Sequence, residues 1–307
     1  MSRIFDALQK SGTEESGIEY PDMVSVATEV FEAPRCRALA DVAVESHVPS
    51  IQPVTGQDRI PEEPVQENVN TPALFPSLEV CVTPSSRLVF FTEPESLAAE
   101  KFRFLGVRLR QIRQSRSLKK VLVTSTIPEE GKSLVSANLA GVLARRKDRV
   151  LLIEGDLRRP TLAEQLGLGR LAGLAEWLQG GLQTPSNIYH LGGPGFWIMP
   201  AGDPPANPLE LMQTGRLSTL MGQLATLFDW IIVDSPPLLP LADTTVLIRM
   251  TDGTLLVTRE GKTEKGLLQR GLEIIKKSDL LGVLLNGCSN PDHDSYYYRR
   301  YSPPATK

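Results

Sequence analysis

The feature that most constrains the fold is a short apolar run that leads through the triplet Gly131-Lys132-Ser133 into a helical pattern. The run covers residues 121–124, and the helical pattern covers residues 134–146. This order is typical of a phosphate-binding loop, in which backbone N–H groups and a helix N-terminus hold an anion. The loop departs from the full pattern at Thr126, where glycine is usual, so an ordinary turn is the alternative interpretation.

Two further motifs place carboxylates at the ends of apolar runs. Glu154 and Asp156 follow the run at 150–154, and Asp234 ends the run at 230–234. Because ligands bind at the carboxyl ends of parallel strands, we expect these acids to lie beside the loop. Asp234 then has the position of a Walker-B carboxylate, which holds Mg²⁺. Glu154 and Asp156 can both face this edge, one as a metal ligand and the other as a proton acceptor.

Apolar runs alternate with helical patterns from residue 78 to residue 290. The runs lie at 121–124, 150–154, 196–199, 230–234, 254–258 and 283–285, and the helical patterns at 95–113, 134–146, 209–228 and 263–277. Buried strands that alternate with helices indicate a parallel sheet covered on both faces. The sequence therefore predicts one α/β domain over residues 78–290, a P-loop NTPase with a doubly wound, mostly parallel sheet.

The segments outside this domain differ from it in composition. Residues 1–10 form a short amphipathic pattern, and residues 11–76 mix Pro, Glu, Ser and Val without a period, which predicts a disordered acidic linker. Residues 1–75 contain five Lys/Arg and thirteen Asp/Glu, a net charge of −8 in a chain whose total is −3. The remainder is close to +5, which suits a nucleotide-binding domain, whereas the total charge argues against nucleic acid as a partner.

The sequence also limits where the chain works. Three cysteines and three histidines are scattered without the spacing of a zinc site or of a disulfide framework, which favours a reducing compartment. No apolar run approaches the about 20 residues that cross a bilayer. We therefore expect a cytoplasmic protein that reaches the membrane only through a partner.

The C-terminal tail, residues 291–307, concentrates tyrosine. Four of the six tyrosines in the chain are Tyr296, Tyr297, Tyr298 and Tyr301. A polar terminus offers these side chains no core in which to pack. They are candidate phosphoacceptors, and the alternative is an aromatic tail that docks on a partner.

Taken together, the three motifs resemble those of the bacterial tyrosine kinases, the P-loop autokinases of capsule and exopolysaccharide synthesis. The family pattern is Gly-Lys-Ser/Thr, then Asp-x-Asp-x-Arg, then Asp-x-Pro-Pro. The matching stretches here are Gly131-Lys132-Ser133, Glu154-x-Asp156-x-Arg158 and Asp234-x-Pro236-Pro237. The similarity extends over roughly residues 85–301, and residues 2–10 resemble the start of the subgroup linked to exosortase loci.

The resemblance implies a tyrosine autokinase that uses ATP and Mg²⁺ to phosphorylate its own tail in a neighbouring subunit. It implies a membrane chain-length regulator as activator, and a location at the inner face of the cell membrane through that partner. The implied nucleotide-binding residues are Glu130, Gly131, Lys132, Ser133, Leu134 and Asn286. The implied metal ligands are Ser133, Asp156 and Asp234, and the implied catalytic residues are Lys132, Glu154, Asp156 and Asp234, with Asp156 or Glu154 as the base.

The chain departs from the family pattern at three places. Glu154 stands where Asp is usual, and Glu129 stands where many relatives have Gly. The assembly motif Glu-x-x-Arg-x-x-Arg reads Glu100, Arg103 and Gly106, so its last Arg is missing. These departures put metal geometry and ring assembly in question.

Two other functions stay open at this point. Partitioning ATPases share the fold, but their loop carries an additional Lys where this chain has Ile127. A regulator that binds ATP without transferring phosphate is the second alternative. A eukaryotic-type protein kinase is excluded, since His-Arg-Asp and Asp-Phe-Gly motifs are absent from the sequence.

Overall fold

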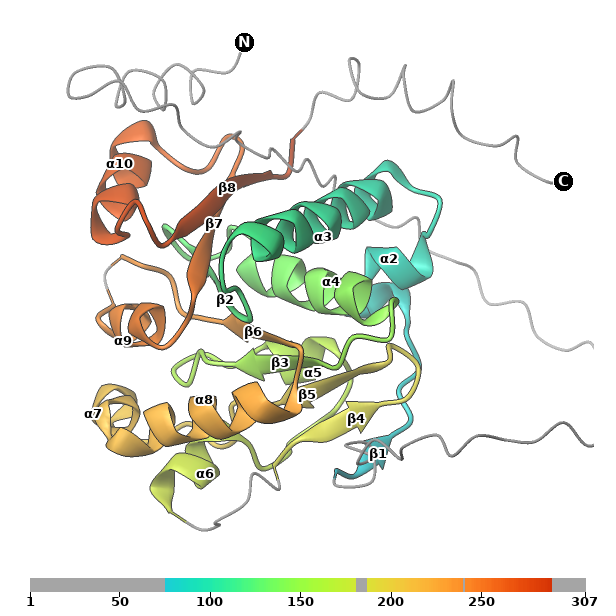
Figure 1. Cartoon of the computed structure of the whole chain (residues 1–307), viewed down its shortest axis with the longest axis vertical. Coiled ribbons are helices and arrows are strands. Elements are labelled where there is room, and N and C mark those ends of the chain that lie inside the picture. The colour runs from blue at the N-terminus through green and yellow to red at the C-terminus, as the bar shows by residue number, and fades with distance from the viewer. Residues whose placement is uncertain (1–74, 181–186, 240, 289–307) are drawn as a thin grey trace, which may run out of the picture.

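The computed structural model describes residues 75–180, 187–239 and 241–288 (Figure 1). Their centre is an eight-stranded sheet in the order β1-β4-β5-β3-β6-β2-β7-β8. All neighbouring strands run parallel except β4 and β5, which are antiparallel. The prediction of a mostly parallel sheet in a P-loop fold is therefore confirmed.

The strands are β1 Ser77–Leu78, β2 Lys120–Ser125, β3 Val150–Glu154, β4 Tyr189–Leu191, β5 Phe196–Met199, β6 Trp230–Asp234, β7 Gly253–Arg259 and β8 Leu280–Asn286. The helices are α2 Val89–Thr92, α3 Leu97–Ser115, α4 Lys132–Ala144, α5 Leu162–Gln165, α6 Leu174–Gln179, α7 Pro208–Gln213, α8 Gly215–Leu227, α9 Asp243–Arg249 and α10 Lys265–Ile274, with a 3₁₀ turn, η2, at Pro84–Ser86.

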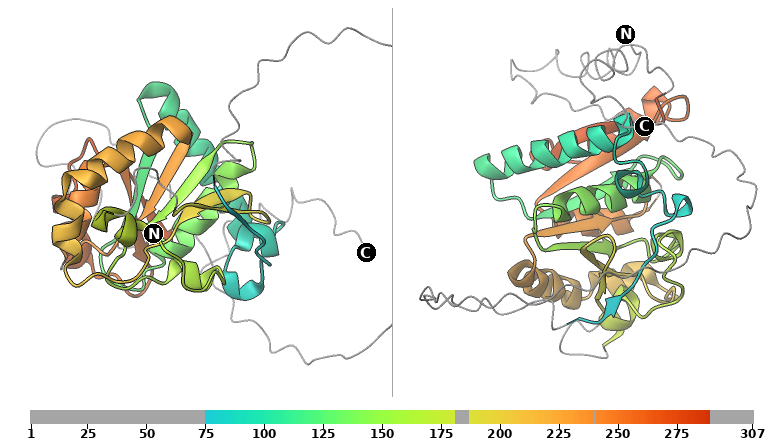
Figure 2. Two further views of the ribbon diagram at one scale, coloured as in Figure 1. Left: turned by 90° about the horizontal axis from the view of Figure 1, so that it is seen from below. Right: turned by 90° about the vertical axis from the view of Figure 1, so that its right-hand side faces the viewer.

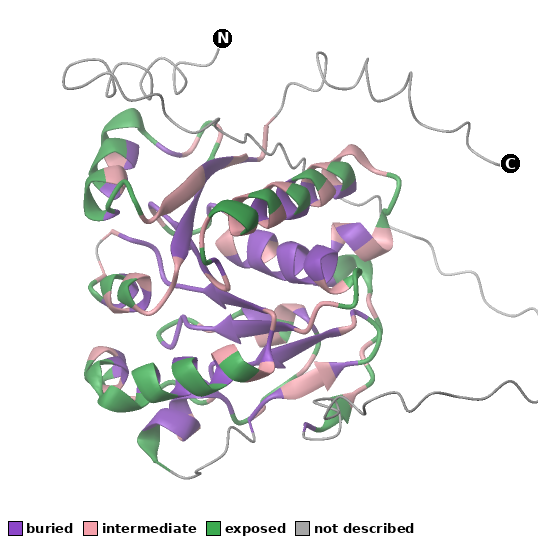
Figure 3. Ribbon diagram, in the orientation of Figure 1, coloured by how far each residue is buried: buried purple, intermediate pink, exposed green. Residues whose placement is uncertain are grey.

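Helices cover both faces of the sheet (Figures 1 and 2). Successive residues of a strand point to opposite faces. In β3, Val150 and Leu152 pack into the cluster that contains the apolar residues of α3 and α4. Leu151 and Ile153 pack into the other cluster, with α6 and α8. Every residue of β3 and β6 is buried, which is why these strands read as continuous apolar runs (Figure 3).

The structure corrects several boundaries that the sequence suggested. Strands β1 and β4 were not expected, because two or three residues are too few to form a recognisable pattern. The helical pattern at 209–228 divides into α7 and α8 at Thr214. The backbone of this residue is extended, with ψ of 143°. Phe75, assigned by its sequence to the linker, is buried and stacks on Phe228 with ring centroids 5.9 Å apart.

No helix in the described part of the chain is long and apolar enough to cross a membrane. The amphipathic segment at 1–10, the linker up to residue 74 and the tyrosine tail lie outside the described residues. The predictions for these segments therefore stay predictions.

Candidate functional site

The three motifs meet at the carboxyl ends of three neighbouring strands. Strand β6 lies between β3 and β2, and Asp234 pairs in register with Glu154 on one side and with Val123 on the other. The loop after β2 leads directly into α4, whose first residue is Lys132. The sequence prediction that the motifs share one edge of the sheet is confirmed.

The turn before α4 depends on Gly131. Its φ is 94°, a conformation that side chains with a Cβ rarely adopt. A Cβ at this position would also lie 2.0 Å from Nδ2 of Asn286. That amide donates a hydrogen bond of 2.8 Å to the backbone oxygen of Glu130, so the end of β8 supports the loop. Asn286, predicted to contact nucleotide, is therefore placed directly against the loop.

Glu130 shapes the loop from inside. Its side chain is buried, with one carboxylate oxygen accepting from the backbone N–H of Ile127 at 2.8 Å and the other from the hydroxyl of Thr263. Burial raises the pKa of Glu130, and these hydrogen bonds partly offset the rise. Since its carboxylate is occupied, Glu130 can contribute to anion binding only through its backbone.

Lys132 lies among carboxylates at the start of α4. Its Nζ is 3.3 Å from Oδ2 of Asp156 and 4.0 Å from Oδ2 of Asp234. Burial alone would lower the pKa of Lys132, but the charges of Asp234, Asp156 and Glu154 outweigh it, so the pKa is raised. The lysine is therefore a cation at neutral pH.

Asp234 is buried at the end of β6. Burial raises its pKa, and Lys132 together with the hydroxyls of Ser133 and Ser136 offsets part of that rise. Ser136 lies one helical turn after Lys132 and has its hydroxyl 3.1 Å from Oδ1 of Asp234. No sequence motif pointed to Ser136, because a serine inside an apolar helix has no motif of its own.

The donor set fits Mg²⁺. Ser133, Asp156 and Asp234 supply one hydroxyl and two carboxylates, the hard oxygen ligands that Mg²⁺ takes when phosphates and waters complete its shell. Among the described residues, no group of three or more His, Cys, Asp or Glu forms a metal cage made by protein alone. The hydroxyl of Ser133 and the two carboxylates are therefore the side chains that could contribute to a magnesium site.

The two acids of the second motif have different surroundings. Asp156 faces Lys132 with one oxygen, and its other oxygen accepts from the backbone N–H of Arg159 at 3.0 Å. Glu154 instead accepts three backbone hydrogen bonds, from Thr161 at 2.7 Å, Leu162 at 2.5 Å and Ala201 at 3.1 Å. Burial raises the pKa of Glu154 despite these bonds. Only Asp156 of the pair contacts the lysine.

Sequence reasoning assigned no role to Asp243, the first residue of α9. Arg158 of the second motif donates to both of its carboxylate oxygens, at 2.5 and 3.1 Å. Asp243 is buried, whereas Arg158 is exposed at the rim. This pair ties the Asp156 loop to the segment that follows Asp234.

The loop also contains a backbone conformation that its sequence does not favour. Glu129 has φ of 65°, in the left-handed region. Its exposed carboxylate contacts Nζ of Lys262 at 2.7 Å, and its backbone oxygen accepts from Arg259.

We expect Glu129→Gly to melt about 1–3 °C above Glu129→Ala, since both lose the lysine contact but only glycine relieves the strain. Thermal unfolding without nucleotide measures this, and equal midpoints would contradict it.

The tyrosines divide between the described and the undescribed chain. Tyr189 lies in β4, its hydroxyl donates to the backbone oxygen of Ala172 at 3.2 Å, and burial raises its pKa. The tail tyrosines and Tyr20 lie outside the described residues.

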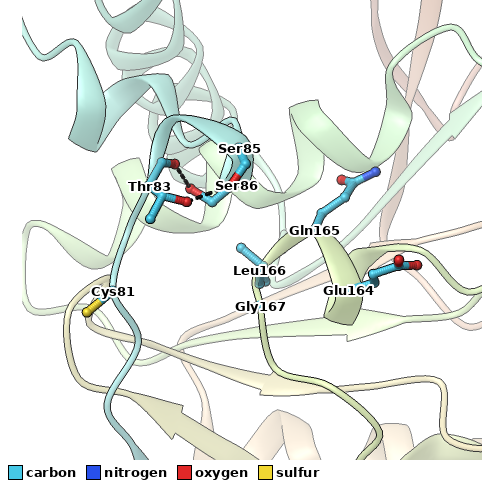
Figure 4. A pocket seen from close by; sticks show the side chains of 8 residues that line it. All are labelled: Cys81, Thr83, Ser85, Ser86, Glu164, Gln165, Leu166 and Gly167. Atoms are coloured by element: carbon cyan, nitrogen blue, oxygen red, sulfur yellow. Dashed lines mark hydrogen bonds between the residues drawn. The ribbon is translucent and has the colours of Figure 1, made fainter. Parts of the chain in front are cut away.

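A separate recess lies between the chain before α2 and the end of α5 (Figure 4). It is lined by Cys81, Thr83, Ser85, Ser86, Glu164, Gln165, Leu166 and Gly167. None of these residues belongs to the three motifs. The recess is therefore distinct from the cluster around Lys132.

The chain is similar to proteins named as tyrosine kinases. It is 35% identical over 219 residues to the tyrosine-protein kinase YwqD of Bacillus subtilis, covering 69% of this chain and 90% of YwqD. It is 30% identical over 229 residues to the tyrosine-protein kinase ptk of Acinetobacter johnsonii, covering 74% of this chain but only 30% of ptk. The kinase domain of Escherichia coli tyrosine kinase ETK superposes with a TM-score of 0.62 at 30% identity, covering 65% of this chain and 79% of that one. No family model matches the chain.

Proposed function

The chain belongs to the bacterial tyrosine-protein kinases, and from this we propose that it uses MgATP to phosphorylate the tyrosines of its own C-terminal tail. The observation that carries the proposal is the position of Lys132, at the N-terminus of α4 and between Asp156 and Asp234. A cation next to two acids at a helix N-terminus suits a site that transfers a phosphoryl group.

Nucleotide binding rests on the loop and the first turn of α4. The backbone N–H groups of residues 130–134 and the N-terminus of the helix can stabilise a bound anion. Lys132 supplies the charge for the β- and γ-phosphates, and Asn286 holds the loop in shape. Ser133, Asp156 and Asp234 would hold Mg²⁺, which when bound neutralises charge on the phosphates.

Asp156 is the best placed proton acceptor. A tyrosine hydroxyl has a reference pKa of about 10, so at neutral pH its proton must move to a base as the oxygen attacks. In the proposed reaction a tyrosine Oη forms a bond to the γ-phosphorus, the bond from that phosphorus to the β–γ bridging oxygen breaks, and ADP leaves. The proton passes to Asp156, while Lys132 stabilises the charge on the transferring group.

In the proposed reaction the tail of one subunit is phosphorylated in the site of a neighbouring subunit of a homo-oligomer. Each phosphotyrosine adds up to roughly two negative charges. Four such groups next to one another repel the acids around Lys132, which weakens docking of the modified tail. Phosphorylation thus separates an associated form from a released form.

The resemblance also supports the wider setting of the proposal. We place the kinase in the control of capsule or exopolysaccharide synthesis, at the inner face of the cell membrane. Its activator would be the cytoplasmic part of a membrane chain-length regulator. The relative ptk extends far beyond the part matched here, which leaves room for such a component in the same polypeptide.

Intact-mass measurement after incubation with MgATP tests the function. We expect increments of one phosphoryl group on the wild type, increased by a candidate membrane partner, and at least a tenfold loss in Asp156→Asn, which keeps the side-chain size. The matched control is Asp203→Asn, an exposed acid outside the site. A partitioning ATPase, or a regulator that only binds ATP, would gain no mass with or without the partner.

A further inference from the structure

Glu154 occupies the first acidic position of the second motif, yet its carboxylate is directed away from Lys132 and from the proposed site of phosphoryl transfer. Its side chain is buried and accepts three backbone N–H bonds at 2.5–3.1 Å. The described carboxylates nearest to Nζ of Lys132 belong instead to Asp156 and Asp234. A carboxylate that accepts three N–H bonds has little capacity left for a proton or a metal.

These bonds join three separate pieces of chain. Thr161 and Leu162 stand at the start of α5, seven and eight residues after Glu154. Ala201 follows β5, the strand next to β3. Glu154 thus hydrogen-bonds to the C-terminal end of the loop of residues 155–160. It also connects that end to the residue that follows β5.

The near end of the same loop is equally restricted. The backbone N–H of Gly155 donates to the backbone oxygen of Asp234 at 2.7 Å, and a Cβ at Gly155 would approach that oxygen to 2.9 Å. The middle is held by the pair between Arg158 and Asp243. Asp156 therefore lies in a loop that is fixed at its start, in its middle and, through Glu154, at its end.

We propose that Glu154 is a positioning residue that fixes the loop carrying Asp156, and that it takes no part in proton transfer or metal binding. The inference rests on the proposed kinase function for its catalytic consequence. The longer side chain is what the arrangement needs. Asp at this position would withdraw the carboxylate by about 1.5 Å, one carbon–carbon bond. It could then not reach the start of α5 and Ala201 together within hydrogen-bonding distance.

The test compares the kcat values of two variants at position 154. Glu154→Gln keeps the length and one acceptor oxygen for Thr161 and Leu162, but its amide NH2 faces the N–H of Ala201, so we expect kcat to fall by less than about tenfold. Glu154→Asp keeps the charge but loses the reach, so we expect kcat to fall by about tenfold to a hundredfold. The KM for ATP and the Mg²⁺ dependence should stay near wild type in both. A base or metal ligand gives the reverse order, with Asp active and Gln inactive, and that order would overturn the proposal.

Hydrogen exchange separates this inference from the kinase assignment. In the full chain without nucleotide, the amides of Thr161, Leu162 and Ala201 should exchange at least about tenfold faster in Glu154→Asp than in the wild type. Glu164, exposed on α5, provides the matched control as Glu164→Asp. Unchanged protection at all three amides would refute the positioning role even in an active kinase. A wild type that transfers no phosphate would refute the kinase proposal while this exchange result still decides the role of Glu154.

Discussion

We expect Lys132→Ala to abolish phosphotyrosine formation, with a loss of at least about a hundredfold in the rate of transfer. The reason is electrostatic. Lys132 is the cation that lies against both Asp156 and Asp234, and without it the phosphates would meet only acids at the end of β6. Removing it also takes away the charge that offsets the raised pKa of Asp234. The measurement is phosphate incorporation from labelled ATP.

Two companion variants make this result specific. Lys132→Met keeps the apolar stem without the charge and should be as inactive as the alanine variant. Lys265→Ala removes an exposed lysine from the start of α10 and should transfer phosphate at the wild-type rate. Wild-type incorporation in a folded Lys132→Ala protein would mean that nucleotide binds elsewhere.

Replacing the four tail tyrosines by phenylalanine should remove nearly all phosphotyrosine while fold and ATP binding persist. The change deletes the hydroxyl nucleophiles of Tyr296, Tyr297, Tyr298 and Tyr301 and keeps the rings. The cluster around Lys132 is built from described residues. Anti-phosphotyrosine detection, with and without a candidate activator, measures the outcome. The variant with four phenylalanines should also remain oligomeric after incubation with MgATP, since no phosphate charge accumulates on its tail.

The control for the tail is Tyr189→Phe, which should leave the signal unchanged because that hydroxyl already donates to Ala172. A strong signal that survives the fourfold replacement would show that the tail is not the main substrate. The acceptor would then be sought at Tyr20 or Tyr189.

The sequence predicted the central fold well because its signals were local and strong. Strands β2, β3 and β6 are almost entirely buried, so each contains a run of apolar residues that leads to a motif. The parallel arrangement then brought Lys132, Asp156 and Asp234 to one edge. These residues form the described cluster, although their chemical roles stay predictions.

Other parts depend on contacts that no local pattern encodes. The carboxylate of Glu154 is directed by backbone amides of α5 and of the chain after β5, up to 47 residues away. Asp243 pairs with Arg158, which precedes it by 85 residues. The division between α7 and α8 turns on one extended residue, Thr214, inside a pattern that is amphipathic on both sides. Distance along the chain hid the contacts of Glu154 and Asp243, whereas the break at Thr214 is local and was hidden by the amphipathic pattern on both sides of it.

The contact between Gly131 and Asn286 has a consequence for variation among relatives. An added Cβ at 131 would overlap the amide of residue 286, so the two positions obey one packing constraint although they lie in the first and last parts of the domain. Substitutions there should be non-additive, because a smaller residue at 286 removes the overlap with a Cβ at 131, although the φ of 94° still disfavours any residue other than glycine there. Covariation between a loop glycine and a residue at the end of the last strand would therefore record van der Waals contact rather than two independent selections.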